Sequence, residues 1–352
     1  TGLPFVDGGR VTLRSTGGVA LAAGSRIDAS SGAALLATGK RRGGKGGDIT
    51  VQANAPSNAG ATLPGRLVLD GELLGYGVEG GGTLSVGGTP VLIAGPDAQA
   101  EDGQLHLTPD FFRKGFSHYV FKGSLQGDAV TIAEGTVLDV EMPVYRLTGA
   151  APAARTGDHA AALEIWTPPL YLEDPQAAAF TQRKGASLSF ADVGDVFIGK
   201  GARIEVDPGQ SISVSAGGQV TIDGRLDAWG GTIAINNGID LKRGAGFVPG
   251  RSIWIGDHAV LDVASRAVTG LDGAGRPFGS VSNGGTIRIG VADLTLDQKG
   301  LPGGITPALV IVRPGAVLDA SGESAAIDLA AGSGPFARSD LRTMPGHGGA
   351  II

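Results

Sequence analysis

Short runs of alternating apolar and polar residues recur along the chain, and each run follows a pair of glycines. The clearest examples are GGRVTL at 8–13, GGDITV at 46–51, GGTLSV at 81–86, GGTIAI at 230–235 and GGTIRI at 284–289. Because the side chains of a strand point alternately to its two faces, each run predicts a strand with one apolar face. The chain ends on GGAII, the opening of the same motif, so we expect it to be a segment of a longer array.

A second pattern, eleven residues long, also recurs. Its copies are VALAAGSRIDA at 19–29, VTIAEGTVLDV at 130–140, VFIGKGARIEV at 196–206, IWIGDHAVLDV at 253–263 and VIVRPGAVLDA at 310–320. Each copy has two apolar positions one residue apart, a turn that usually contains glycine, and then an apolar residue, an acid and a small apolar residue. Glycine supplies the positive φ that such a turn needs. The template therefore predicts a strand, a turn and a second strand.

The two patterns together predict the fold. Two strands from the template and one from the GG motif make one coil of a right-handed parallel β-helix, and such coils must stack to bury their apolar faces. We therefore expect an all-β solenoid of about a dozen coils, with loop and short-helix insertions. The copies that begin at 196, 253 and 310 are 57 residues apart. This spacing fits either three coils of about 19 residues or two coils with an insertion.

Departures from the repeat divide the chain. We expect β-helix coils over 1–98, an aromatic-rich insertion over 99–129, a coil over 130–140, a Pro/Ala-rich insertion over 141–185 and coils over 186–352, which stop short at the C-terminus. Shorter decorations are expected at 264–283 and 322–347. The stretch DPQAAAFTQRKG predicts a short helix, capped by Asp174 and with Pro175 at its first position.

Composition narrows the classes of protein. The chain has 352 residues, of which 62 are glycine and none is cysteine, and its formal charge is −6. Glycine does not fall at every third position, which excludes collagen, and the apolar content of 42% is too high for disorder. The sequence contains no stripe of basic residues, which would have suggested nucleic acid as a partner. It also contains no apolar run of the roughly 20 residues that a membrane helix needs. The sequence opens without a signal peptide.

The repeats resemble a known family. LAAGSRIDASSG and VRPGAVLDASGE, with LTPDFFRKGFSHYVFKG between coils, are similar to the filamentous-haemagglutinin-like exoproteins of Gram-negative bacteria. The resemblance covers most of the chain, although the Asn-Pro motifs of the family's N-terminal secretion domain are not visible. It implies a β-helical rod that is secreted through an outer-membrane transporter by the two-partner route. It also implies a location on the bacterial cell surface and a role in adhesion.

The aromatic segment 110–123, DFFRKGFSHYVFKG, supplies the candidate ligand-binding residues. Rings beside basic side chains suit stacking on a sugar and hydrogen bonding to its hydroxyls. The candidates are Phe111, Phe112, Arg113, Lys114, His118 and Tyr119. The alternative is that these rings pack onto the wall of the helix and hold the insertion in place, because exposing so many rings risks aggregation.

The acids of the eleven-residue template form a second candidate. They are Asp28, Asp139, Glu205, Asp262 and Asp319. They could bind cations along the rod or act as the catalytic carboxylates of a β-helical polysaccharide-active enzyme. Catalysis would need clustered acids with a basic residue beside them, and no Asp-Asp pair occurs. We expect instead that each carboxylate accepts backbone N–H groups at a corner.

Other motifs are weaker. GGKGGDITV at 43–51 resembles one calcium-binding nonapeptide out of register, and KRRGGK at 40–45 could contact acidic glycans but fits a solvated loop. Large apolar residues at the outward position of three copies predict either burial under an insertion or a contact stripe. They are Phe197, Trp254 and Ile311. The histidines lack metal-ligand spacing, so we expect no metal, no cofactor and no catalytic residue.

The sequence thus predicts a non-enzymatic rod segment of a secreted surface adhesin. Its partner would be a glycan or a receptor on a host or bacterial surface, reached through corner insertions. Two alternatives stay open: a β-helical polysaccharide-active enzyme, and a structural spacer without a ligand.

Overall fold

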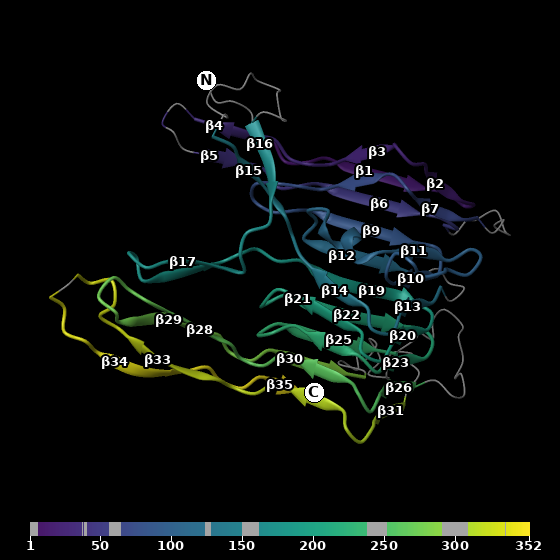
Figure 1. Cartoon of the computed structure of the whole chain (residues 1–352). Helices are drawn as coiled ribbons and strands as arrows, with labels where there is room; N and C mark the ends of the chain where they lie inside the picture. Colours follow the sequence, from purple (N-terminus) through teal and green to yellow (C-terminus); the bar gives the residue numbers. More distant parts are fainter. Residues whose placement is uncertain are drawn as a thin grey trace, which may run out of the picture.

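The chain is folded almost entirely from short β-strands. The structure, a computed structural model, describes residues 6–36, 38, 41–55, 65–123, 128–149, 162–237, 252–290, 309–334 and 336–352. Most of the strands pair in parallel and stack one above another from the N-terminal to the C-terminal part of the chain (Figure 1). The prediction of an all-β fold with parallel sheets is confirmed.

Three parallel sheets contain most of the strands. The nine-stranded sheet consists, in order, of β1 (Arg10–Arg14), β6 (Asp48–Gln52), β9 (Thr83–Gly87), β12 (His118–Lys122), β19 (Ser187–Val193), β22 (Ser211–Ala216), β25 (Thr232–Asn236), β30 (Thr286–Ile289) and β35 (Ala350–Ile351). The seven-stranded sheet consists of β11 (Leu105–Leu107), β10 (Val91–Ile93), β13 (Val130–Ile132), β20 (Val196–Ile198), β23 (Val220–Ile222), β26 (Ser252–Ile255) and β31 (Leu309–Val312). The five-stranded sheet consists of β14 (Val137–Val140), β21 (Arg203–Val206), β24 (Arg225–Asp227), β27 (Val260–Asp262) and β32 (Val317–Asp319). Two parallel pairs precede them, β2 (Val19–Leu21) with β7 (Leu67–Leu69) and β3 (Arg26–Asp28) with β8 (Glu72–Leu74).

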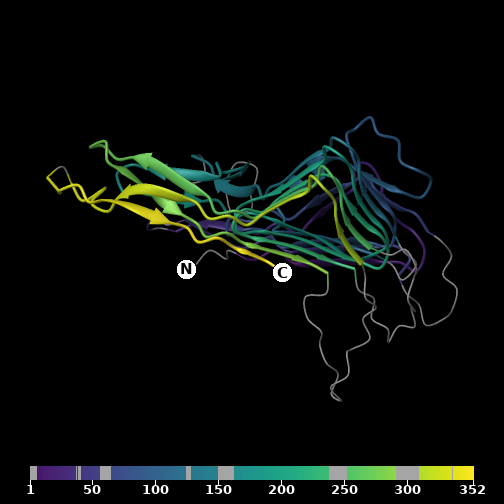
Figure 2. The same cartoon turned by 90° about the horizontal axis from the view of Figure 1, so that it is seen from below.

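The chain visits these sheets in a fixed order. From β19 onward it passes through the nine-stranded, the seven-stranded and the five-stranded sheet in turn and then returns to the first. We call each such visit a passage. Strands of successive passages overlie one another in Figure 2. The eleven-residue template supplies the step from the seven-stranded to the five-stranded sheet, for example β20 to β21, and the GG motif supplies strands of the nine-stranded sheet.

The interior is filled by one face of the stacked parallel strands. In β22 the outward residues are serines, whereas Ile212, Val214 and Ala216 are no more than 1% exposed. Two of these residues lie over counterparts in β25, with Ile212 paired to Ile233 and Val214 to Ile235. Apolar residues of the same type therefore form columns through the core, and each column is buried because a passage covers it on either side.

The paired glycines mark a corner at which successive passages touch. A Cβ atom on Gly285 would lie 2.0 Å from the carbonyl oxygen of Gly231, and one on Gly349 would lie 1.9 Å from that of Gly285. The same oxygens accept the hydrogen bonds that begin the strands, from Thr286 N at 2.8 Å and Ala350 N at 2.9 Å. No other residue fits here, because any side chain would overlap the backbone below it.

The spacing of the template does not correspond to a constant number of passages. Val196 pairs with Val220, and Val220 pairs with Ile253, so two steps separate the first pair of copies. Ile253 pairs directly with Val310, so one step separates the second pair. The two intervals are equally long because the second contains inserted residues in place of a passage. The prediction of about a dozen coils is also too high for the described residues, in which the largest sheet has nine strands.

Antiparallel hairpins project from a single corner of the passages. They are β4–β5 (Ala33–Leu35, Arg41–Gly43), β15–β16 (Val144–Leu147, Leu163–Trp166), β17–β18 (Tyr171–Asp174, Ala179–Gln182), β28–β29 (Ala267–Leu271, Pro277–Val281) and β33–β34 (Ser324–Asp328, Leu341–Pro345). Each hairpin lies in the segment of the chain that leads into the next strand of the nine-stranded sheet. The last two lie within the decorations 264–283 and 322–347.

The predicted helix at Asp174 is wrong. The segment forms the hairpin β17–β18, and the Asp174 carboxylate accepts hydrogen bonds from Gln176 N at 3.1 Å and Ala177 N at 3.0 Å. These bonds close a tight turn that Ala178 completes at a positive φ of 48°. Asp174 does accept nearby backbone N–H groups, as a helix cap would, but the turn that it stabilises joins two strands.

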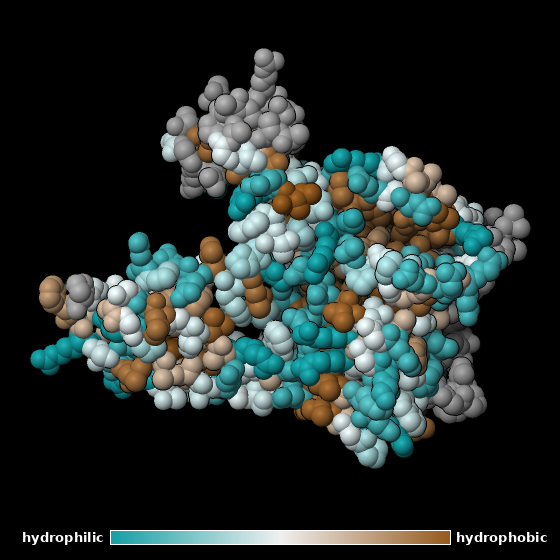
Figure 3. All heavy atoms as spheres, in the orientation of Figure 1, coloured by the Kyte–Doolittle hydropathy of each residue, from teal (hydrophilic) through white to brown (hydrophobic). Residues whose placement is uncertain are grey.

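Three of the projecting hairpins, β17–β18, β28–β29 and β33–β34, also pack on one another. Phe180 of β18 stacks on Phe278 of β29 with ring centroids 5.0 Å apart, and Gly332 N, beyond β33, donates to Asp272 at 3.1 Å. Arg276 pairs with Asp272 at 2.8 Å, and both side chains are largely buried. The result is an arm beside the three sheets, whose surface mixes hydrophilic and hydrophobic residues (Figures 1 and 3).

Replacing Gly285 with alanine should destabilise the fold by about 3 kcal/mol or more, because the new Cβ would overlap the Gly231 carbonyl oxygen. Gly9→Ala is the matched control. Gly9 occupies the same position of the motif, but a Cβ there meets nothing within 4 Å. Urea unfolding of both variants checks the prediction. Equal midpoints for the two variants would show that the corner does not depend on close stacking.

Candidate functional site

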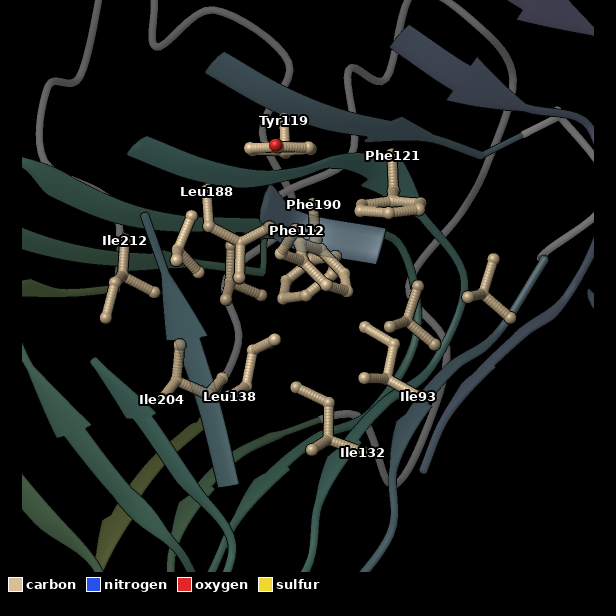
Figure 4. Close-up of a cluster of buried hydrophobic side chains, with 14 of the residues drawn as sticks. Ile93, Phe112, Tyr119, Phe121, Ile132, Leu138, Leu188, Phe190, Ile204 and Ile212 are labelled. Carbon is tan, nitrogen blue, oxygen red and sulfur yellow. The ribbon is translucent and has the colours of Figure 1, made fainter. Parts of the chain in front are cut away.

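The aromatic segment lies inside the molecule. Phe112 and Tyr119 are fully buried and in contact with each other, Phe112 also contacts Phe121, and Phe111 is half-buried beside Phe112 and Phe121. Figure 4 shows Phe112, Tyr119 and Phe121 among the apolar side chains of the surrounding sheets, which include Phe190. A ligand cannot reach Phe112 or Tyr119, so the binding prediction is wrong for these two residues.

The basic residues of the aromatic segment lie in different parts of the structure. Arg113 Nε lies 3.2 Å from the carboxylate of Glu141, the residue after β14 of the five-stranded sheet. His118, in contrast, is exposed on β12 of the nine-stranded sheet. Lys114 donates its backbone N–H to the Tyr119 hydroxyl at 2.9 Å. The structure therefore does not gather these residues around one site, and a binding role for Phe111, Arg113, Lys114 and His118 stays a prediction.

The segment departs from the repeat because it replaces a strand. The 3-10 helix η1 (Pro109–Arg113) lies between β8 and β14, at the place where later passages have a strand of the five-stranded sheet. The segment 99–129 was expected to be an insertion, yet it supplies β11, η1 and β12 and so completes a passage. Rings occupy the space that the missing strand would have filled, and Gly75 leaves room for them, since a Cβ there would lie 2.2 Å from the Phe116 ring.

Phe112→Ala should lower the free energy of unfolding by about 3–5 kcal/mol, because it empties the space at the centre of the ring cluster. Phe336→Ala removes the same side chain at a position that is 98% exposed and should change the stability by less than about 0.5 kcal/mol. Thermal or urea unfolding measures both. A small effect at Phe112 would mean that η1 does not pack as described.

The template acids meet on the five-stranded sheet. Asp139 pairs with Glu205, and the column continues through Asp227, Asp262 and Asp319. The neighbouring positions, such as Leu138 and Leu261, are in the core, so the carboxylates lie on the opposite face of the sheet. The eleven-residue template predicted four of these acids, Asp139, Glu205, Asp262 and Asp319. It did not include Asp227, although VTIDGRLDA at 220–228 is a shortened form of the template and contains it.

Arginines from the same sheet interleave with the carboxylates. Arg203 pairs with Glu205 and with Asp227, at 3.1 Å to the latter. Arg225 binds Asp227 and Asp262, each at 2.8 Å. Arg266 adds a contact to Asp262 at 2.9 Å and its guanidinium lies over the Trp229 ring. The result is a ladder of alternating charges, which we call the arginine–carboxylate ladder, defined by Arg203, Glu205, Arg225, Asp227 and Asp262.

Burial makes this ladder stiff. The Asp227 side chain is fully buried and that of Asp262 is 6% exposed. Burial raises the pKa of Glu205 above its ordinary value, although Arg203 opposes the shift. Hydrogen bonds to Asp227 and the charges of Asp227 and Asp262 raise the pKa of Arg225. Such carboxylates are paired and hydrogen-bonded, as buried charges must be.

The prediction of corner hydrogen bonds holds for three of the acids. Asp28, Asp262 and Asp319 each accept a backbone N–H two residues along the chain, at 2.9 to 3.0 Å. Asp28 does not join the column, because β3 pairs only with β8, where its partner is Leu74. Hydrogen bonds from Ser321 lower the pKa of Asp319. Asp139 pairs with Arg113 at 3.5 Å.

A depression of about 340 Å³ lies beside the ladder, at the corner where the seven-stranded sheet turns into the five-stranded one. Three successive turns line it with Lys200, Gly201, Ala202, Arg203, Gly224, Arg225 and His258. Two of these turns depend on glycine. A Cβ on Gly224 would lie 2.6 Å from the Ala202 carbonyl oxygen, and Gly201 has a φ of +69°.

The outward apolar residues lie next to this corner. Thr131, Phe197, Thr221, Trp254 and Ile311 follow one another in register across the seven-stranded sheet. Phe197 is 40% exposed, and Trp254 is partly covered by the Arg313 guanidinium, 5.1 Å from the ring centroid. Phe197 is therefore not buried under an insertion, which was one of the two alternatives that the sequence left open.

The remaining motifs have structural roles or fall outside the described residues. Lys40 of KRRGGK is not described, and the next three residues form β5 of a hairpin. Residues 43–51 lead from β5 into β6. Across the described ranges no three His, Asp or Glu side chains group as metal ligands. The helical residues described here include no segment with the length and apolar character of a membrane span.

Removing Arg225 should destabilise the protein, because Asp227 and Asp262 would each lose a partner while staying buried. Arg225→Met keeps most of the stem and should cost about 2–3 kcal/mol, since Arg203 and Arg266 still contact the two acids. Arg10→Met breaks the exposed pair with Asp48 and should cost less than about 1 kcal/mol. Chemical unfolding compares them. Equal small losses would mean that the ladder contributes no more than surface ion pairs do.

Comparisons with known proteins do not identify a family. A scan against protein-family models, a search of curated proteins and a search of solved structures each found no match.

Proposed function

We propose that the chain is a rod-forming, non-enzymatic segment of a secreted bacterial surface adhesin, folded as a right-handed parallel β-helix. The observation that carries this proposal is the fixed order in which the chain visits three parallel sheets, in register from one passage to the next. A chain that repeats this order winds along one axis. A rod of stacked passages is stable because each passage adds its own contacts and those with its neighbours.

The surface supports a role in contact. The hairpins that project as an arm display apolar side chains, among them Leu271, Leu329 and Leu341, each more than half exposed. The outer face of the seven-stranded sheet displays Phe197. Insertions and outward residues of a repeat protein can vary without disturbing its core, so they are the natural place for recognition. The repeats' resemblance to filamentous-haemagglutinin-like exoproteins adds secretion through an outer-membrane transporter to this proposal.

The chemistry of the ladder favours binding over catalysis. General acid–base work on a glycosidic bond needs two carboxyl groups that hold different protonation states. In the ladder, Glu205, Asp227 and Asp262 each form an ion pair with an arginine, so their oxygens are engaged within the ladder rather than presented to a substrate. The proposal is therefore a protein that holds surfaces together without transforming them.

Beads coated with the chain should adhere to bacterial or epithelial cells, or to a polysaccharide film, at several times the level of beads coated with an unrelated protein of similar charge. The expected reason is multivalent display of weak contacts on a rigid support. Flow-cell counting of retained beads measures the effect.

The same protein denatured before coating serves as the second control. Retention no higher than that of the controls on every surface would contradict the adhesin proposal and leave a spacer without a ligand. Release of reducing ends from an acidic polysaccharide, lost in Asp262→Asn, would contradict the non-enzymatic part.

A further inference from the structure

The depression at the ladder's corner is lined by four basic side chains and by no acidic one. They are Lys200, Arg203, Arg225 and His258. A hollow lined in this way lowers the energy of a negatively charged group that enters it, because the cations lie on several sides of it. The protein as a whole carries a charge of −6, so this basic lining is a local feature.

These side chains keep hydrogen-bond donors available. Arg203 and Arg225 use Nε and Nη2 for the ladder carboxylates, which leaves Nη1 of each without a partner among the described residues. His258 uses Nδ1 for Asp223 at 3.1 Å, which leaves Nε2. Lys200 forms no ion pair within the described ranges. The carboxylates thus hold the two arginines in place without occupying all their donors.

An aromatic surface adjoins the charges. Phe197 precedes Lys200 by three residues in the same strand and turn, and Trp254 precedes His258 by four. The two aromatic residues are two strands apart in one column, which places them roughly 10 Å from each other, with Thr221 between. Rings and a hydroxyl in a row suit the apolar face and the hydroxyl groups of a sugar chain. A bare anion would use the charges but not the rings.

We propose that this corner binds an acidic saccharide. Its carboxylate or sulfate enters the depression between Lys200, Arg203 and Arg225, and the adjoining sugar ring lies against Phe197. The inference rests on the proposed adhesin function and names the ligand class of one of its contact surfaces.

Titration calorimetry with three oligosaccharides of similar length tests this: one bearing carboxylates, such as oligogalacturonate, one bearing sulfates, and one neutral. Lys200→Ala should weaken binding of the acidic oligosaccharide about tenfold, as the loss of a charge-assisted hydrogen bond does. Phe197→Ala should weaken it about fivefold through lost ring contact. The neutral oligosaccharide should not bind measurably. The carboxylate and sulfate arms tell which anion is preferred.

Two controls match the variants. Lys122→Ala removes the same charge from an exposed position on the nine-stranded sheet, and Phe336→Ala removes an exposed ring from the hairpin arm. Both should bind like the unaltered protein, and circular dichroism should show all four variants folded. Binding that is unchanged by Lys200→Ala and Phe197→Ala, or no binding of either acidic oligosaccharide, would overturn the inference. Inorganic sulfate binding as tightly as the oligosaccharide would overturn its saccharide part.

The bead assay separates this inference from the function on which it rests. Retention of beads that is unaffected by Lys200→Ala would sink the corner site and leave the adhesin proposal standing. Absence of retention for the unaltered protein would remove the adhesin proposal itself.

Discussion

Close stacking of the backbone at the glycine corner is the constraint on which the rest of the structure depends. Where a passage opens with the GG motif, it rests on the one before it with a Cα of one chain segment against a carbonyl oxygen of the other, as Gly285 does on Gly231. This contact fixes the register of the nine-stranded sheet. Once that register is fixed, inward side chains fall in columns, and the apolar core follows from stacking like on like.

The five-stranded sheet shows how the fold accommodates different residues and elements while the glycine corner stays the same. In one passage η1 replaces a strand, and a cluster of rings fills the space. In the passages that follow, arginine and carboxylate side chains pair on the outer face and form the ladder. The described hairpins leave from the corner beside this sheet, and three of them, β17–β18, β28–β29 and β33–β34, pack into an arm of their own.

The same separation explains where recognition can occur. Residues that face inward are held by neighbours above and below and cannot be altered without cost, as the burial of Phe112 and Ile233 illustrates. Outward residues such as Phe197 and Lys200 are not packed into the core in this way, yet the sheet holds their backbones in place. A weak contact made at one such position gains strength when many copies of the chain present it together.

The sequence by itself determined the strands and turns, because those depend on local alternation and on glycine. Both patterns identified strands that the structure contains, such as β25 and β30, and the turns at Gly135 and Gly201 have the positive φ expected. Only the tertiary structure decided which aromatic residues are buried and that Asp227 joins the ladder, since both depend on residues far away in the chain.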